Sequence, residues 1–400
     1  MRLTTLLLVA AACGAVAGCS GDRDTKVVTE LLARAKSKLA PDRRTVVFDV
    51  SGALRGKTLT LTGEVHNAGL RDQLLRIVKD EGFDPVDSLT VLPDRGLGDR
   101  TVGIVSQSVA NIRAKPGHPA ELVTQAIMGT PVHILKKDDG WLYIQTPDEY
   151  LGWSDAEIVA MTAEEYAGWT ARQKVIVTTE VGFVRSERDP ASRPVSDMVA
   201  GALFALKADA GRHFEVEYPD GRTGFLLKDH AEPYDAWLKG AKDSPESIVA
   251  TAYRFFGVPY FWGGTSSKGM DCSGFTKTVY FLNGVLLPRD ASQQALVGEP
   301  VSQDENMASV KPGDLLFFGS RARDDRPERV THVAISLGGR RFIHTGGGGG
   351  VTTNSLDPAD TDFSKHRERG FLHVRRVIGA GEEAGIRRLA SVPYYRSHER

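Results

Sequence analysis

MDCSGFTKTVYF, residues 270–281, places a cysteine where an apolar run with helical spacing begins. Phe275 and Val279 recur four positions apart, so the sequence predicts a helix with Cys272 at its N-terminus. The unpaired backbone N–H groups there, and the positive end of the helix dipole, favour a thiolate over a thiol. They can also stabilise an oxyanion that forms beside the sulfur. The stretch therefore indicates a nucleophilic cysteine.

Two histidines lie further along the chain, each inside a β-prone run. His332 lies in RVTHVAIS (329–336) and His344 in RFIHT (341–345), with Leu-Gly-Gly between the runs as a hairpin signal. With a three-residue loop, His332 faces His344 directly, and the second imidazole can orient the first. With a two-residue loop, the two histidines lie on opposite faces of the sheet. An imidazole near Cys272 would lower the thiol pKa further and could protonate a leaving amine.

The segments around these residues form a wider pattern. PYFWGGTSSKGMDCSGF, KPGDLLFF and THVAISLGGRRFIH occur in that order between residues 257 and 345. They resemble the NlpC/P60 family of cysteine peptidases, which has a papain-like core. The resemblance implies Cys272 as nucleophile, His332 as base and His344 as orienting residue. It also implies that Tyr260, Asp271 and Ser273 help to hold the substrate. Tyr260 would in addition assist in stabilising the oxyanion.

Alternatives to these roles remain open in the sequence. Asp271 can simply cap the helix with its carboxylate, and Tyr260 can be a packing residue. A zinc site built from the cysteine and the two histidines would have only three ligands, and no Cys-x-x-Cys or His-x-x-x-His motif supports it. We therefore expect no metal and no organic cofactor.

An internal repeat precedes this region. Asn111-Ile112-Arg113 matches Phe183-Val184-Arg185, and Gly152-Trp153 matches Gly224-Phe225, with the same offset of 72 positions. Short alternating runs between Gly, Pro and Asp predict a small β-barrel in each copy. The copies, residues 100–162 and 172–232, resemble bacterial SH3 domains.

Two SH3-like modules ahead of an NlpC/P60 domain resemble the γ-D-glutamyl-L-diamino acid endopeptidases. In that group the first module narrows the substrate cleft, and an acid and a tyrosine from it capture the free amine of L-Ala. Glu121 in AELVTQ and Tyr150 in DEYLGW match those positions. The second copy has Arg193 and Arg222 instead, which indicates different tasks for the two modules. Surface drift is the alternative explanation.

The N-terminus has the features of a targeting segment. Leu6–Ala12 is an apolar run too short to span a bilayer, and VAGCS (16–20) resembles the lipobox of bacterial lipoproteins. The resemblance implies cleavage before Cys19 and acylation of that residue, which leaves Cys272 as the free thiol of the mature chain. An ordinary secretory signal is the alternative. In a cell with two membranes, Ser20 rather than Asp after Cys19 favours anchoring at the periplasmic side of the outer membrane over anchoring at the inner membrane.

Composition limits the remaining possibilities. The chain has 400 residues, 50 Lys+Arg against 51 Asp+Glu, and three Cys. A net charge of −1 argues against nucleic-acid binding as the main task, and three cysteines exclude a disulfide framework. Residues 26–93 alternate between helical and strand periodicity and loosely resemble a BON-type envelope domain.

These features predict an α+β protein: a papain-like catalytic domain preceded by two small SH3-like β-barrels and a small α+β unit. The expected function is hydrolysis of the γ-D-Glu–diamino acid bond in murein peptides. The protein is expected to be a monomer that is anchored to a membrane through lipid. A broader murein hydrolase and a wall-binding adaptor with an idle peptidase domain are the alternatives. The expected boundaries are 1–18 signal peptide, 19–25 tether, 26–93 α+β unit, 100–162 and 172–232 barrels, 233–243 linker, 244–385 peptidase domain and 386–400 tail.

Overall fold

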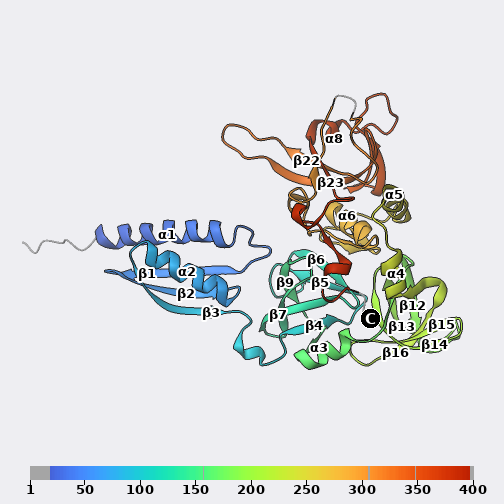
Figure 1. Ribbon diagram of the computed structural model, residues 1–400, viewed down its shortest axis with the longest axis horizontal. Helices are drawn as coiled ribbons and strands as arrows, with labels where there is room; N and C mark the ends of the chain where they lie inside the picture. Colours follow the sequence, from blue (N-terminus) through green and yellow to red (C-terminus); the bar gives the residue numbers. More distant parts are fainter. Residues whose placement is uncertain (1–18, 156, 305–306, 347, 397–400) are drawn as a thin grey trace, which may run out of the picture. The chain divides into compact units, whose positions relative to one another are not determined.

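The computed structural model describes residues 19–155, 157–304, 307–346 and 348–396 (Figure 1). The chain divides into two compact units, with the division after Asp94. No helix in the described part of the chain is long and apolar enough to cross a membrane. The predicted signal peptide, residues 1–18, lies outside the described residues.

The first unit is a three-stranded sheet with two helices. Strand β1 pairs antiparallel with β2, and β2 pairs parallel with β3 because α2 makes the crossover. Leu59 and Leu61 on β2 are fully buried against apolar residues of both helices. The first helix reaches back over residues 19–25, where a tether was expected. The elements are α1 (Cys19–Leu39), β1 (Phe48–Arg55), β2 (Thr58–Val65), α2 (Ala68–Asp80) and β3 (Asp84–Val91).

The second unit begins with two seven-stranded antiparallel sheets of identical connectivity. Their strand orders are β10-β4-β7-β8-β9-β5-β6 and, in the reverse direction, β13-β12-β16-β15-β14-β11-β17. The first sheet contains β4 (Val102–Val105), β5 (Val109–Arg113), β6 (Leu122–Ile127), β7 (Pro131–Asp138), β8 (Trp141–Gln145), β9 (Leu151–Ser154) and β10 (Ile158–Met161). The second contains β11 (Lys174–Val177), β12 (Val181–Arg185), β13 (Pro194–Val199), β14 (Leu203–Ala210), β15 (His213–Glu217), β16 (Thr223–Leu227) and β17 (Ala231–Pro233).

The predicted 72-residue offset extends to details of these two barrels. A β-bulge follows Ile134 in the first barrel and Leu206 in the second. Arg113 donates to the carbonyl of Ala120, and Arg185 donates to that of Ser192. Because the bulges and the arginine hydrogen bonds occur at matching positions, the sequence repeat is also a structural repeat.

Helices connect the barrels to each other and to the last domain. A capping box, formed by Thr162 and Glu165, starts α3 (Ala163–Thr170) between the barrels. After the second barrel, α4 (Tyr234–Gly240) occupies residues expected to be a polar linker. Tyr234 and Trp237 bury their rings there, which is why the segment is helical and packed rather than extended.

The last domain packs helices on a six-stranded sheet of order β21-β26-β22-β23-β24-β25. Ser244 caps the first helix and accepts a hydrogen bond from the backbone N–H of Ser247. Phe275 and Val279 on α6 are fully buried, which confirms the predicted inner face of that helix. The elements are α5 (Pro245–Arg254), β18 (Thr265–Ser266), β19 (Gly269–Met270), α6 (Cys272–Phe281), β20 (Val285–Leu286), α7 (Ala291–Gln294), β21 (Glu299–Pro300), β22 (Leu315–Ser320), β23 (Arg329–Gly338), β24 (Arg341–Gly346), β25 (Gly350–Ser355), α8 (Lys365–Gly370), β26 (Phe371–Arg376) and β27 (Arg387–Arg388).

The segment expected to be a C-terminal tail is packed through its described part, residues 386–396. Leu389 is fully buried, and Tyr394 donates a hydrogen bond to the carbonyl of Gly129 in the first barrel (2.6 Å). Tyr234 in α4 donates to the carbonyl of Tyr395 (2.5 Å). The chain end therefore joins the first barrel to the catalytic domain.

Candidate active site

Cys272 is the first residue of α6. Asp271 caps that helix: its Oδ1 accepts a hydrogen bond from the backbone N–H of Gly274 at 2.7 Å. The structure thus confirms a helix N-terminus at the cysteine. Only 9% of Cys272 is exposed, and its sulfur also receives a hydrogen bond from the backbone N–H of Val333, the residue that follows His332.

Burial determines the protonation state of Cys272. Burial, and next the nearby Asp271 carboxylate, raise the pKa of the Cys272 thiol to about 11. Backbone N–H groups of Val333 and Ser273 favour the thiolate but do not offset the burial. The thiol is therefore protonated at neutral pH, because burial outweighs the backbone N–H groups that favour the thiolate.

The two histidines share one face of the sheet, but not in the register that the sequence suggested. Ile335 pairs with Ile343 and Gly338 pairs with Arg341, so the hairpin has a two-residue loop. A β-bulge between Ser336 and Gly338 adds one residue to β23 and reverses the effect of that loop on side-chain direction. His332 and His344 are consequently diagonal neighbours and not directly opposite.

A chain of hydrogen bonds fixes the tautomers of this pair. Asn354 donates through Nδ2 to the carbonyl of Asp362 (2.9 Å), so its Oδ1 faces His344 Nε2 (2.9 Å) as the acceptor. His344 Nε2 then carries the hydrogen, and its Nδ1 accepts from His332 Nε2 at 2.7 Å. His332 is left with Nδ1 as its proton-accepting nitrogen, which is the atom needed to take a proton from a thiol.

Burial keeps both imidazoles neutral. It lowers the pKa of His332 well below the usual value and lowers that of His344 to about 4. The resting pair is thus a protonated thiol and a neutral base. Such a pair transfers its proton when the thiol attacks, as in general-base catalysis.

Asp271 and Ser273 belong to a buried cluster that also contains an arginine not predicted from the sequence. Arg289, 1% exposed, binds Asp271 through both Nη atoms (3.0 and 2.5 Å) and donates to Ser273 Oγ (2.9 Å). Its Nε donates to Thr124 Oγ1 in the first barrel (2.9 Å). Asp271 is both a cap and an ion-pair partner, while the substrate roles of Asp271 and Ser273 remain predictions. No periodicity marks an arginine as buried, so the sequence did not reveal this residue.

The first barrel places its two predicted residues against the catalytic domain. Glu121 is exposed and accepts a hydrogen bond from Trp262 Nε1 at 3.0 Å. Tyr150 is buried and donates to Asp290 Oδ2 at 3.1 Å. Trp262 and Asp290 were not predicted. Trp262 lies beside Gly263 in the PYFWGG motif, which was a usable signal, whereas no quoted motif contains Asp290.

Tyr260 lies partly buried near the thiol. Burial, and next the Cys272 group, raise the pKa of Tyr260 to about 12. Its hydroxyl is therefore protonated at neutral pH and can donate a hydrogen bond.

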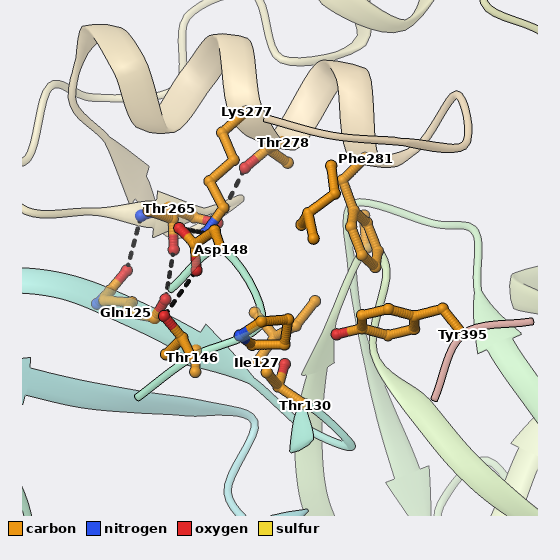
Figure 2. A pocket seen from close by; sticks show the side chains of 14 residues that line it. Gln125, Ile127, Thr130, Thr146, Asp148, Thr265, Lys277, Thr278, Phe281 and Tyr395 are labelled. Atoms are coloured by element: carbon orange, nitrogen blue, oxygen red, sulfur yellow. Dashed lines mark hydrogen bonds and ion pairs between the residues drawn. The ribbon is translucent and has the colours of Figure 1, made fainter. Parts of the chain in front are cut away.

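The opposite side of α6 is fixed to the first barrel. Figure 2 shows Lys277 reaching from the helix to Asp148, and their charged atoms are 2.6 Å apart. Burial opposes the charge on Asp148, but Lys277 lowers the pKa of that carboxyl below its usual range. The adjoining cavity of about 60 Å³ is far smaller than the roughly 300–1,000 Å³ of ligand pockets. This region therefore positions the helix that carries the cysteine.

Known protein families match the catalytic domain and the first barrel separately. A model of the NlpC/P60 family matches residues 257–368, and one of the bacterial dipeptidyl-peptidase SH3 domain matches residues 112–156. Over 261 residues the chain is 30% identical to dipeptidyl-peptidase 6 of Lysinibacillus sphaericus, which covers 64% of this chain and 91% of that protein. The chain belongs to the NlpC/P60 family.

Other NlpC/P60 proteins agree with this assignment. The chain is 29% identical over 234 residues to the γ-D-glutamyl-L-lysine dipeptidyl-peptidase of Bacillus cereus, covering 56% of this chain and 67% of the relative. The crystal structure of an NlpC/P60 family protein from B. cereus aligns with 69% of this chain and 99% of its own, with a TM-score of 0.59 and 22% identity. The latter shows a shared fold. This NlpC/P60 protein is a cysteine peptidase.

Proposed function

We propose that the protein hydrolyses the bond between γ-D-Glu and the diamino acid in murein peptides that begin with a free L-Ala. The observation that carries this proposal is the contact of the first barrel with the catalytic domain at Trp262 and Asp290. Glu121 and Asp290 contribute two carboxylates there, and Tyr150 binds the second of them. Carboxylates suit an ammonium group, and this arrangement supports recognition of a free amino terminus.

The reaction would run as acyl transfer through Cys272. His332 Nδ1 takes the thiol proton while the sulfur attacks the γ-carbonyl carbon of D-Glu. The N–H groups at the start of α6 and the Tyr260 hydroxyl donate to the oxyanion. His332 then gives its proton to the leaving amine, and the C–N bond breaks. Water, deprotonated by the same imidazole, attacks the thioester and releases the γ-D-Glu product and the thiol.

The test compares free and blocked substrates. Purified protein is incubated with L-Ala-γ-D-Glu-L-Lys, with its N-acetyl form and with intact sacculi, and the products are identified by mass spectrometry. We expect L-Ala-γ-D-Glu and free lysine from the first substrate only. Equal cleavage of the acetylated peptide would exclude amine recognition and favour the broader murein hydrolase. No cleavage of any substrate would favour the wall-binding adaptor.

We also propose that the mature protein is anchored through a lipid on Cys19. The apolar run and the lipobox-like VAGCS support this. Incorporation of labelled palmitate into the wild type, and its loss in Cys19→Ala, would be the expected result. A wild-type protein recovered without label in the soluble fraction would contradict it.

A further inference from the structure

Arg367, on the short helix α8, lies beside the two histidines. A Cβ at Gly346 would be 3.3 Å from Arg367 Nη2 and 3.3 Å from His344 Cε1, so both groups flank the same glycine. The guanidinium carbon is also 5.8 Å from the ring of Phe318, which lies against the ring of His332. Arg367 is therefore a cation at the histidine side of the active site.

Within residues 19–155, 157–304, 307–346 and 348–396, the Arg367 side chain has no acidic partner: it forms neither an ion pair nor a hydrogen bond to a carboxylate. Arg289, in contrast, already binds Asp271, Ser273 and Thr124. Arg289 and Arg367 both lie close enough to Tyr260 to affect its pKa. Of these two, only Arg367 can bind an anionic ligand without losing an existing ion pair.

The pKa shifts of Arg367 and His332 also indicate that Arg367 lies close to the catalytic groups. Burial lowers the pKa of Arg367, while Cys272 and Tyr260, both able to become anions, oppose that shift. After burial, Arg367 is the next cause that lowers the pKa of His332. A partly buried cation beside a catalytic base costs free energy unless an anionic ligand binds to it.

The ligand follows from where the guanidinium lies. His332 must protonate the leaving amine, so the leaving diamino acid has to lie next to it. Every such residue can offer a carboxylate there: the α-carboxylate when it ends the peptide, and a second, side-chain carboxylate when it is meso-diaminopimelate. On the acyl side, the proposed function assigns Glu121 and Asp290 to the ammonium group of L-Ala instead.

We propose that Arg367 binds a carboxylate of the leaving diamino acid and so favours peptides that carry one. This inference rests on the proposed function, because it assigns the group recognised on the far side of the same scissile bond. An arginine pairs with a carboxylate through two parallel hydrogen bonds, which gives both affinity and orientation.

The experiment measures kcat/KM for four peptides with free L-Ala. These are L-Ala-γ-D-Glu-L-Lys, its C-terminal amide, the meso-diaminopimelate peptide with its C-terminal α-carboxyl amidated, and L-Ala-γ-D-Glu-L-Lys with the α-carboxyl of D-Glu amidated. Wild type is compared with Arg367→Gln and Arg367→Lys. Arg369→Gln, an exposed arginine on the same helix, is the matched control.

We expect Arg367→Gln to lower kcat/KM about ten- to a hundredfold on the L-Lys peptide and to have little effect on its C-terminal amide. Arg367→Lys should retain most of the activity, and Arg369→Gln all of it. A loss in Arg367→Gln on the amidated meso-diaminopimelate peptide identifies the side-chain carboxylate as a ligand; no loss there leaves the α-carboxylate.

Two results would overturn the inference. An equal loss on all four peptides would mean a structural role for Arg367. A loss that disappears only with the amidated D-Glu would place its ligand on the acyl side. If Arg367→Gln does not fold, the wild type still decides, because equal kcat/KM for the L-Lys peptide and its amide contradicts the proposal. Failure of the wild type to cleave any peptide would instead refute the proposed function.

Discussion

His332 Nε2 and His344 Nδ1 are 2.7 Å apart, although the two residues are not opposite each other in the sheet. A bulge before the hairpin loop brings them to one face, and Asn354 fixes which nitrogen carries each hydrogen. Neutral histidines and a protonated thiol then form a site whose activity depends on proton transfer during attack.

Replacing the nucleophile should stop the reaction and leave the fold intact. We expect Cys272→Ala to reduce product release below detection, because no other thiol is present in the catalytic domain. Chromatography of the released peptide and the melting temperature would be recorded together. Turnover at the wild-type rate would refute the mechanism.

His344 should contribute to catalysis by orienting the imidazole of His332. His344→Ala should lower kcat by about 10²- to 10⁴-fold, with a small change in KM, because His332 loses the acceptor that fixes its tautomer. Asn354→Leu should cause a smaller loss in the same direction. Steady-state kinetics of both variants check this, and unchanged kcat in His344→Ala would exclude it from the catalytic set.

The raised thiol pKa predicts slow alkylation. With a pKa of about 11, Cys272 should react with iodoacetamide at pH 7 about a hundredfold more slowly than free cysteine. The rate should rise about tenfold per pH unit toward pH 11, since each unit increases the thiolate fraction tenfold. Cys272→Ala gives the background reaction. Rapid alkylation that is constant from pH 6 to 8 would instead indicate a resting thiolate.

The buried ion pair behind α6 should be needed as a pair. Lys277→Leu leaves the Asp148 carboxylate without its counter-ion, and we expect a loss of about 3–5 kcal/mol in the free energy of unfolding. Lys277→Leu combined with Asp148→Leu should recover most of that loss. Denaturant unfolding measures both. The exposed pair of Lys228 and Asp209 offers a control, in which Asp209→Asn should have little effect.

Recognition of the amine should depend on the first barrel. Glu121→Gln should lower kcat/KM for L-Ala-γ-D-Glu-L-Lys about ten- to a hundredfold, because a charge-assisted contact is worth roughly 1.5–3 kcal/mol. Glu187→Gln, in the corresponding loop of the second barrel, should leave it unchanged. The same assay on the N-acetylated peptide should show no difference between Glu121→Gln and wild type.

Local patterns in the sequence were sufficient for several parts of this protein. The 72-residue repeat predicted both barrels, and the spacing of Phe275 and Val279 predicted the helix that begins at Cys272. Each of these depends on residues close together in the chain, or on a repeat visible by comparison of the chain with itself. Cys272, His332 and His344 could be proposed together from their motifs.

Contacts between distant segments could be decided only by the tertiary structure. Arg289 meets Asp271 within the catalytic domain. Arg289 also meets Thr124, and Lys277 meets Asp148, across the boundary with the first barrel, which no local pattern crosses. The bulge that aligns the histidines depends on how two strands pair. The thiol pKa depends on burial: the sequence specified a helix N-terminus that favours a thiolate, but only the folded chain removes water from Cys272, and that desolvation is the larger effect.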